Sequence, residues 1–399
     1  EILMGIPYPA AAGLLVAVTA LYTYRGGFRA VASTDALQLF VMAAGAAVAF
    51  AAVLSMAGGP PEAGERLLLS SPAHLSRDGA GPGLGLGPLL GLWLLWGLAD
   101  PLFPQLFQRF YAARDDESLR RVAVYYPVVC GILFFLTVGV GVTGAALLPG
   151  LAAGESEQIF PRLAVAFSRP FASAAFALAA AAALMSTMDS QLLTLSSMIV
   201  QDFFPRRSRS RGIDGAMIAA LALLSWLAAL SPPVLILDTL TGIAFPAYAA
   251  LAPAVWAGLY GRRVDARGIT AATGLGLALV GLDAADLVSF GPVPAAAAVL
   301  AAQVIVLLAL RTPIPPGSPP ALAPSIRVTF GTRWLAGIAC LAGLATIAWK
   351  YGTAPSLAAG IPVWVWMSLA SCILLSILIS GWKPGSGGAR PENRARYVP

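Results

Sequence analysis

The sequence contains few charged residues, few cysteines and a single histidine. Of its 399 residues, 11% are charged, three are cysteine and one is histidine. The three cysteines fall in apolar runs, and their spacing matches no disulfide or zinc pattern. A catalytic triad or a membrane-embedded enzyme would need clustered histidines or paired acidic residues, so these scarcities argue against an enzyme.

The scarcity of charge accompanies long apolar runs. The chain is 58% hydrophobic and has a mean hydropathy of +0.79. The runs are rich in Ala, Gly and Leu and do not alternate with period two, which favours helices over a barrel. The sequence thus predicts an all-α, polytopic helical membrane protein in the lipid bilayer. About eleven transmembrane spans can be read, at Pro7–Tyr24, Ala32–Ala57, Leu84–Phe107, Val122–Leu148, Phe171–Met198, Ala216–Leu230, Leu237–Leu259, Ile269–Leu287, Val293–Leu310, Trp334–Ala348 and Ile361–Ile379.

The basic residues indicate orientation rather than an acidic partner. With the loop after the first span placed inside, 20 of the 25 basic residues fall on the cytoplasmic side. By the positive-inside rule this asymmetry predicts a multi-pass protein of the cell membrane with a cytoplasmic C-terminus, and it argues against nucleic-acid binding. The loop that carries His74 is then predicted to lie outside.

Proline and glycine suggest how the chain is divided. The stretch beginning TPIPPGSPPALAPS is typical of an extended linker. We expect a main membrane domain over residues 1–311, a cytoplasmic Pro-rich linker over 312–333, two further transmembrane helices over 334–382, and a basic, disordered cytoplasmic tail over 383–399. No feature of the sequence indicates an oligomeric state.

One apolar helix, Ala179–Phe204, carries a stripe of polar residues. Spacings of one, three and four place the stripe on one side of the helix, with Asp189 beside it. Small hydroxyls commonly serve helix packing, but a long polar stripe in a bilayer favours a water-filled path or an ion. The stripe comprises Ser186, Thr187, Ser190, Gln191, Thr194, Ser197 and Gln201.

Three segments together resemble the sodium:solute symporter family, which includes sodium/proline, pantothenate and sodium/glucose transporters. They are LYTYRGGFRAVASTDALQ at Leu21–Gln38, WGLADPLFPQLFQRFYAAR at Trp96–Arg114 and ALMSTMDSQLLTLSSMIVQDF at Ala183–Phe203. The resemblance implies an inverted-repeat, leucine-transporter-like core. It also implies sodium-coupled uptake of a small organic solute by alternating access. The family's first four helices have no counterpart here, so we expect an N-terminally truncated chain.

The resemblance also implies ion-binding residues. The sodium ligands would be the carbonyl of Ala183 and the hydroxyls of Ser186 and Thr187, and spacings of three and four do present three oxygens to one point. Asp35 would lie on the ion's inward exit, unless it caps a helix N-terminus. Asp189 and Ser190 lie next to these ligands, and Asp189 is either a guide for sodium or a helix–helix hydrogen bond. These carboxylates also leave a proton-coupled variant open.

The segment around Asp100 is predicted to contact the solute. Pro101 and Pro104 break the backbone hydrogen bonds of the helix at membrane depth, where transporters place solute sites. The predicted contact residues are Trp96, Asp100, Phe103, Pro104 and Gln105. The alternative is a kinked helix end with its aromatic residues at the membrane interface. The residues from Arg109 to Arg121 are interpreted as a positive-inside loop.

A second class of function is a membrane sensor, because some proteins join this kind of membrane domain to a signalling kinase. Such a sensor would need a long cytoplasmic extension, which the short tail from Lys383 does not provide.

Overall fold

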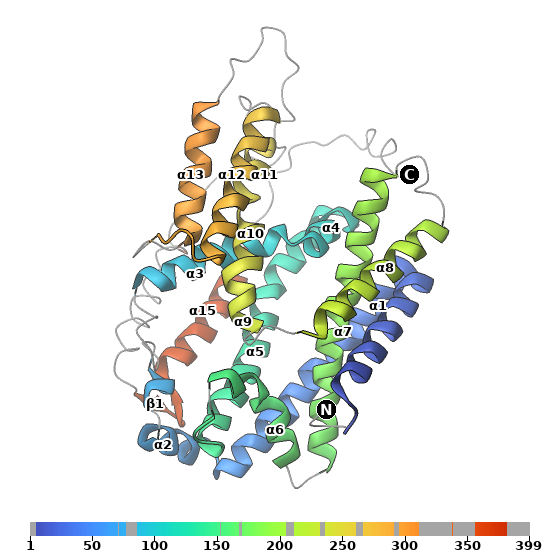
Figure 1. Cartoon of the computed structure of the whole chain (residues 1–399). Coiled ribbons are helices and arrows are strands. Elements are labelled where there is room, and N and C mark those ends of the chain that lie inside the picture. Colours follow the sequence, from blue (N-terminus) through green and yellow to red (C-terminus); the bar gives the residue numbers. More distant parts are fainter. Residues whose placement is uncertain are drawn as a thin grey trace.

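The computed structural model describes the chain as a set of long helices with two very short strands (Figure 1). Short segments between helices, the linker and the tail lie outside this description. The described residues are 5–70, 72–76, 86–151, 153–166, 170–204, 211–231, 236–260, 266–290, 295–310, 337 and 356–380.

Helix α1 (Tyr8–Ala57) consists of two arms that meet at Gly27. Gly27 has φ 57° and ψ −156°, a conformation that a residue with a side chain rarely adopts. The arms correspond to the predicted spans Pro7–Tyr24 and Ala32–Ala57. At the far end of α1, Gly58 in the left-handed conformation ends the helix by donating its N–H to the preceding turn.

Two long helices pack against α1 and each other. Helix α7 (Pro170–Phe203) lies along both arms of α1, and α8 (Arg211–Ala229) packs on α1 and α7 (Figure 1). Small residues permit the close approach: a Cβ at Gly45 would lie 2.5 Å from the Ala179 Cβ. This contact places the polar stripe of α7 beside the second arm of α1.

The segment predicted as a single span at Leu84–Phe107 is divided into three. Helix α3 (Leu86–Ala99) leads into a 3₁₀ turn, η2 (Asp100–Leu102), and then into α4 (Pro104–Ala112). Phe103, between the last two, is extended with ψ 124°, as the residue before a proline favours. The break therefore lies where the two prolines predicted it.

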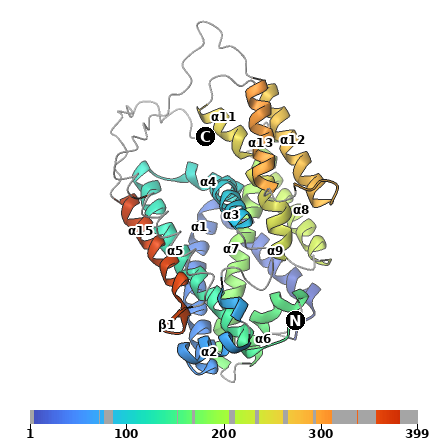
Figure 2. The same ribbon diagram turned by 90° about the vertical axis from the view of Figure 1, so that its left-hand side faces the viewer.

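A second pair of helices covers another side of the molecule. Helix α5 (Asp116–Leu147) packs along α15 (Val363–Ser380), and the two run side by side in Figure 2. At the end of this pair lie α2 (Pro60–Ser70), η1 (Pro72–Leu75) and a small antiparallel hairpin. Its strands are β1 (Leu357–Ala358) and β2 (Ile361–Pro362), and the sequence did not indicate them.

Short elements fill the remaining connections. Between α5 and α7 lie η3 (Ala153–Gln158) and α6 (Ile159–Ala166). The predicted span Leu237–Leu259 is irregular. It consists of α9 (Ile236–Thr239), a π-helical turn η4 (Leu240–Ala244), α10 (Phe245–Ala249) and α11 (Ala252–Tyr260), and it is followed by α12 (Ala266–Ala284) and α13 (Ala295–Ala309).

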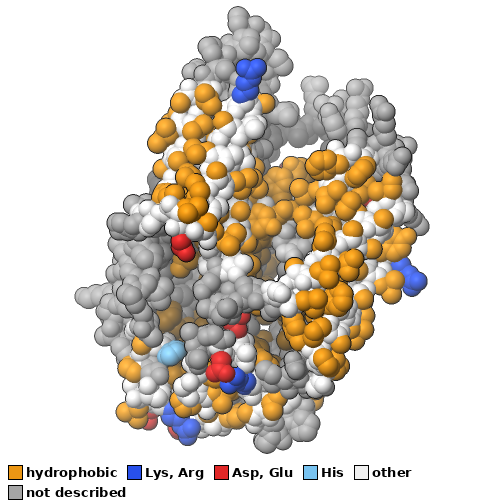
Figure 3. Space-filling model, in the orientation of Figure 1, with side chains coloured by type: hydrophobic (Ala, Val, Ile, Leu, Met, Phe, Trp, Pro, Cys, Tyr) orange, Lys and Arg blue, Asp and Glu red, His pale blue; other side chains and the backbone are white. Residues whose placement is uncertain are grey.

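Within the described residues, six helical segments are long and apolar enough to cross a membrane, and they account for seven of the predicted spans because α1 contains two. The segment α3–α4 is interrupted, and α13 is shorter. Helix α12, which corresponds to the predicted span Ile269–Leu287, is not among the six, and Trp334–Ala348 lies outside the described residues except for Gly337, so the count of eleven stays a prediction. In Figure 3 hydrophobic side chains spread over the face formed by α1, α7 and α8, as expected where lipid is the solvent. The chain is an all-α, multi-pass membrane protein.

Candidate ion and solute pathway

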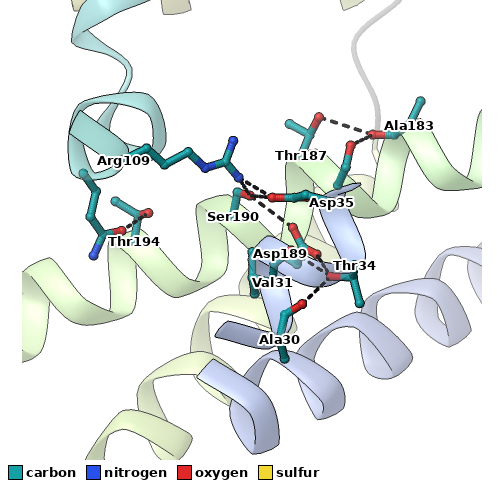
Figure 4. A network of polar contacts seen from close by, with 12 residues as sticks. Ala30, Val31, Thr34, Asp35, Arg109, Ala183, Thr187, Asp189, Ser190 and Thr194 are labelled. Atoms are coloured by element: carbon teal, nitrogen blue, oxygen red, sulfur yellow. Dashed lines mark hydrogen bonds and ion pairs between the residues drawn. The ribbon is translucent and has the colours of Figure 1, made fainter. Parts of the chain in front are cut away.

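A network of polar side chains joins α1, α4 and α7 (Figure 4). Asp189 of α7 is 0% exposed and accepts a hydrogen bond of 2.6 Å from the hydroxyl of Tyr22 on α1. Its other carboxylate oxygen accepts a bond of 3.2 Å from Ser190 Oγ. A carboxylate inside a membrane protein must find such partners because lipid offers none. The first arm of α1 and the middle of α7 are thus held together by a buried acid.

Arg109 of α4 extends this network to a second carboxylate. Its guanidinium forms an ion pair with Asp35 of α1 and donates a 2.6 Å hydrogen bond to Ser190 Oγ of α7. Ser190 Oγ also lies 3.4 Å from Asp35. The structure therefore brings Asp35, Asp189 and Ser190 together, with one cation, Arg109, against them.

Helix geometry accounts for this meeting. Asp189 and Ser190 lie side by side on the buried face of α7, where the second arm of α1 packs. Asp35 lies two turns inside that arm, so it does not cap a helix N-terminus and that alternative is wrong. Thr34, its neighbour, donates to the carbonyls of Ala30 and Val31 and lies 3.5 Å from Asp189.

Several buried oxygens on α1 have no hydrogen-bond partner within the described part of the chain. They are Thr19 Oγ1, Thr23 Oγ1, Asp35 Oδ1 and Gln38 Oε1. Thr19 and Thr23 are both 0% exposed. Buried oxygens without partners are costly, and water or a small cation would satisfy them. The chemistry of this face of α1 thus suits a hydrated or cationic path.

The predicted sodium ligands lie together on α7, within the two turns that precede Asp189 and Ser190. Ser186 Oγ is 3.0 Å from the carbonyl oxygen of Ala183, and Thr187 Oγ1 is 3.3 Å from the same atom. The three oxygens therefore gather at one point, and the side chain of Thr187 is exposed. Both hydroxyls here donate to the carbonyl, so the two hydroxyl oxygens retain lone pairs that could accept a cation.

Aromatic residues gather at the break between α3 and α4. Trp96 meets Phe245 of α10 edge to face with ring centroids 4.5 Å apart, and Phe103 lies 5.3 Å from the same ring. Phe103 also meets Tyr248 of α10 at 4.9 Å. The broken helix is thus packed against a second irregular segment.

The polar members of the predicted solute site are placed differently. Asp100 begins the 3₁₀ turn, and its carboxylate accepts a 2.9 Å hydrogen bond from Tyr126 of α5. Pro104 and Gln105 begin α4, where Gln105 is half-buried. One turn further along α4, Gln108 Oε1 accepts a 2.6 Å bond from Thr194 of the α7 stripe. Helix α4 therefore connects the break to the polar face of α7.

Two contributors to the network were not predicted from the sequence. Arg109 was interpreted as part of a positive-inside loop, but it lies in the last turn of α4 with its side chain directed at α1 and α7. The sequence pattern did not indicate a role for Tyr22. Both residues belong to the segments that resemble the symporter family. The sequence signal that could have identified Arg109 was its position on the same helix as the predicted break.

Comparison with known proteins agrees with this architecture. The model of the family described as Sodium:solute symporter family matches residues 1–276. This chain belongs to the sodium:solute symporter family.

Relatives within the symporter family are transporters. The Sodium/pantothenate symporter of Escherichia coli is 30% identical over 282 residues, covering 68% of this chain and 58% of that protein. The Osmoregulated proline transporter OpuE of Bacillus subtilis is 29% identical, covering 70% of this chain and 58% of that protein. The Sodium/proline symporter of Salmonella typhimurium is 30% identical, covering 58% and 48%. The chain spans about half the length of these relatives.

Proposed function

We propose that this chain forms the greater part of a sodium-coupled symporter that takes up a small organic solute by alternating access. The observation that carries the proposal is the partly buried network of Tyr22, Asp35, Arg109, Asp189 and Ser190, in a chain that belongs to a sodium symporter family. Ionisable side chains within membrane-spanning helices are costly and typically mark ion pathways. An inverted-repeat core is part of the same proposal.

The proposed ion route begins at the oxygens of Ala183, Ser186 and Thr187. Neutral oxygens bind sodium weakly enough for it to leave, as transport requires. About one helical turn along α7, Asp189 and Ser190 would receive the ion, and Asp35 would guide its exit. The Arg109 guanidinium is paired with Asp35 in this structure and would have to be displaced for sodium to use that carboxylate.

The proposed solute site is the break between α3 and α4, with Trp96, Asp100, Phe103, Pro104 and Gln105. The aromatic rings there could stack on a solute, and the freed backbone carbonyls could accept its hydrogen bonds. The relatives named above are pantothenate and proline transporters, so these two compounds are the solutes to test first.

The decisive experiment measures uptake of radiolabelled proline and pantothenate into cells that express the complete gene. We expect Ser186→Ala and Thr187→Ala each to raise the sodium concentration for half-maximal uptake about tenfold, or roughly 1.4 kcal/mol. Each change removes one oxygen from a small ligand set.

Ser196→Ala is the matched control. This residue lies on the same helix and donates to a backbone carbonyl, that of Leu193, as Ser186 does to Ala183. Unchanged sodium dependence in both test variants would mean that these hydroxyls serve helix packing and do not bind sodium. Uptake driven by a pH gradient without sodium would instead establish the proton-coupled variant.

A further inference from the structure

A single buried amide connects three helices on the side of the molecule away from the polar network. Gln303 of α13 is 0% exposed, and its Nε2 donates to the carbonyl of Ala250 at 2.7 Å and to that of Ala272 on α12 at 3.0 Å. Both protons of the amide are therefore used on backbone carbonyls outside α13, one on α12 and one at the break between α10 and α11. Gln303 lies beyond residue 276, where the match to the symporter family ends.

Ala250 lies at the break between α10 and α11. Helix α10 ends at Ala249 and α11 begins at Ala252, and the first backbone bond of α11 runs from Val255 to Leu251. The carbonyl of Ala250 precedes that bond, and it is among the groups that helix termini leave without an intrahelical partner. With Ala250 1% exposed, water does not reach this residue from the surface, and Gln303 supplies the donor.

The sequence of α12 leaves room for this amide at one position. A Cβ on Gly276 would lie 2.1 Å from Gln303 Nε2 and 3.2 Å from the Cβ of Ala250. By contrast, a Cβ on Gly274, two residues earlier on the same helix, would meet nothing within 4 Å. Gly276 is thus needed for the amide to reach both carbonyls, whereas Gly274 is not.

The segment that ends at Ala250 carries the aromatic wall of the proposed solute site. Phe245 and Tyr248 pack on Trp96 and Phe103 at the broken helix. Just before them lies the π-helical turn Leu240–Ala244, a feature that often marks functional sites. The aromatic segment therefore has an irregular turn at one end and the Gln303 contact at the other.

We propose that Gln303 is a positioning residue that fixes the C-terminal end of the segment Leu240–Ala249 to the α12–α13 pair. Motion of this segment then takes place at the π-helical turn, while Ala250 stays in place and Phe245 and Tyr248 turn about it. The link to transport rests on the proposed function. The mechanical role of the amide does not, because it depends only on the contacts of Gln303.

Hydrogen–deuterium exchange on the complete protein in lipid nanodiscs tests the anchoring directly. We expect Gln303→Leu and Gly276→Ala each to raise backbone exchange in peptides covering residues 245–255 about fivefold or more. The reason is that each change removes the buried hydrogen bonds that hold the break. Gly274→Ala is the control for a methyl group on α12, and Val299→Ala, which trims a buried residue of α13 that makes no such bond, is the control for loosened packing.

A residue that supports the fold in general would raise exchange across α12, α13 and the aromatic segment alike, which is the result we expect for Val299→Ala. That result, or unchanged exchange in both test variants, would overturn the proposal. If Gln303→Leu does not reach the membrane, Gly276→Ala against Gly274→Ala still decides the question. Localised exchange in a protein that takes up no sodium-coupled solute would uphold the anchor and refute the proposed function.

Discussion

The α1–α7 pair and the α5–α15 pair are both long contacts between membrane-spanning helices, yet they differ in chemistry. Between α1 and α7, side chains from both helices and from α4 meet in hydrogen bonds and an ion pair. Beside α5 and α15 lies a cavity of about 500 Å³ whose lining is mostly apolar, including Phe134 and Leu369. The first contact is therefore polar, whereas the second borders an apolar cavity.

This difference shows where function is expected. Apolar helix pairs in a bilayer need only shape and small residues to associate. The α5–α15 pair adds two hydrogen bonds to backbone carbonyls, from Ser376 to Val124 and from Arg120 to Ser380. Packing of α1 against α7 does not require the carboxylates of Asp35 and Asp189. Their cost inside a membrane is understandable if an ion passes them, so variants in the two regions should behave differently.

The largest effect is expected when the ion pair on the α1–α7 side is broken. Asp35→Asn leaves the Arg109 guanidinium without its carboxylate and removes the proposed exit site for sodium. Because the proposed exit then lacks its charge, we expect sodium-driven uptake to fall about a hundredfold. Uptake is measured in cells at matched amounts of protein in the membrane.

The ion pair between Glu155 and Arg162 supplies the control. It has a nitrogen–oxygen distance of 2.7 Å, and both side chains are at least one-third exposed. Glu155→Gln should change uptake less than twofold, as is usual for a surface pair. Equal loss in the two variants would mean that Asp35 matters for folding and not for ion passage.

Which features of the two regions could be predicted from the sequence depends on whether the contacts lie within one segment. The break at Asp100–Phe103 was predictable because two prolines fix it within four residues. The gathering of Ser186 and Thr187 around Ala183 follows from helical spacing alone. Both are properties of a single segment.

The remaining contacts join segments distant in the sequence. Tyr22 reaches Asp189 across 167 residues, and Gln303 reaches Ala250 across 53. Tyrosine and glutamine in apolar runs carry no sign of which helix they will face, so only the packed structure reveals these partners.

A smaller effect is expected at the solute site, where Asp100 accepts a hydrogen bond from Tyr126 of α5. We expect Asp100→Asn to weaken solute affinity about tenfold, because a carboxylate facing a solute offers a charge that an amide lacks. Sodium binding to the empty carrier should stay within twofold. Both affinities are measured on purified protein, with radiolabelled sodium and with whichever of proline and pantothenate is transported.

Tyr126→Phe separates this role from a structural one. It removes the hydrogen bond and leaves the carboxylate in place, so solute affinity should be retained. If Tyr126→Phe and Asp100→Asn both lower the amount of folded protein and weaken both ligands alike, Asp100 serves the contact between η2 and α5 and is not part of the solute site.

The smallest effect is expected at the start of α5, on the apolar side of the comparison. Asp115 caps this helix by accepting from the backbone N–H of Ser118 at 2.8 Å and from its hydroxyl at 2.6 Å. These bonds to Ser118 lower the pKa of the Asp115 carboxyl below its usual value. A lowered folded-state pKa means that the cap stabilises the protein above the ordinary carboxyl pKa and loses this contribution as pH falls through the folded-state value.

Asp115→Ala should therefore lower the thermal midpoint slightly at pH 7, and the difference from the unaltered protein should shrink in the acidic range where the carboxylate protonates. Uptake per folded molecule should not change, because the cap lies outside the polar network of α1, α4 and α7. Asp115→Asn, which keeps an acceptor for the Ser118 N–H, should recover most of the midpoint at neutral pH. A loss of sodium dependence in Asp115→Ala would show that α5 takes part in ion coupling and would remove the distinction between the two helix pairs.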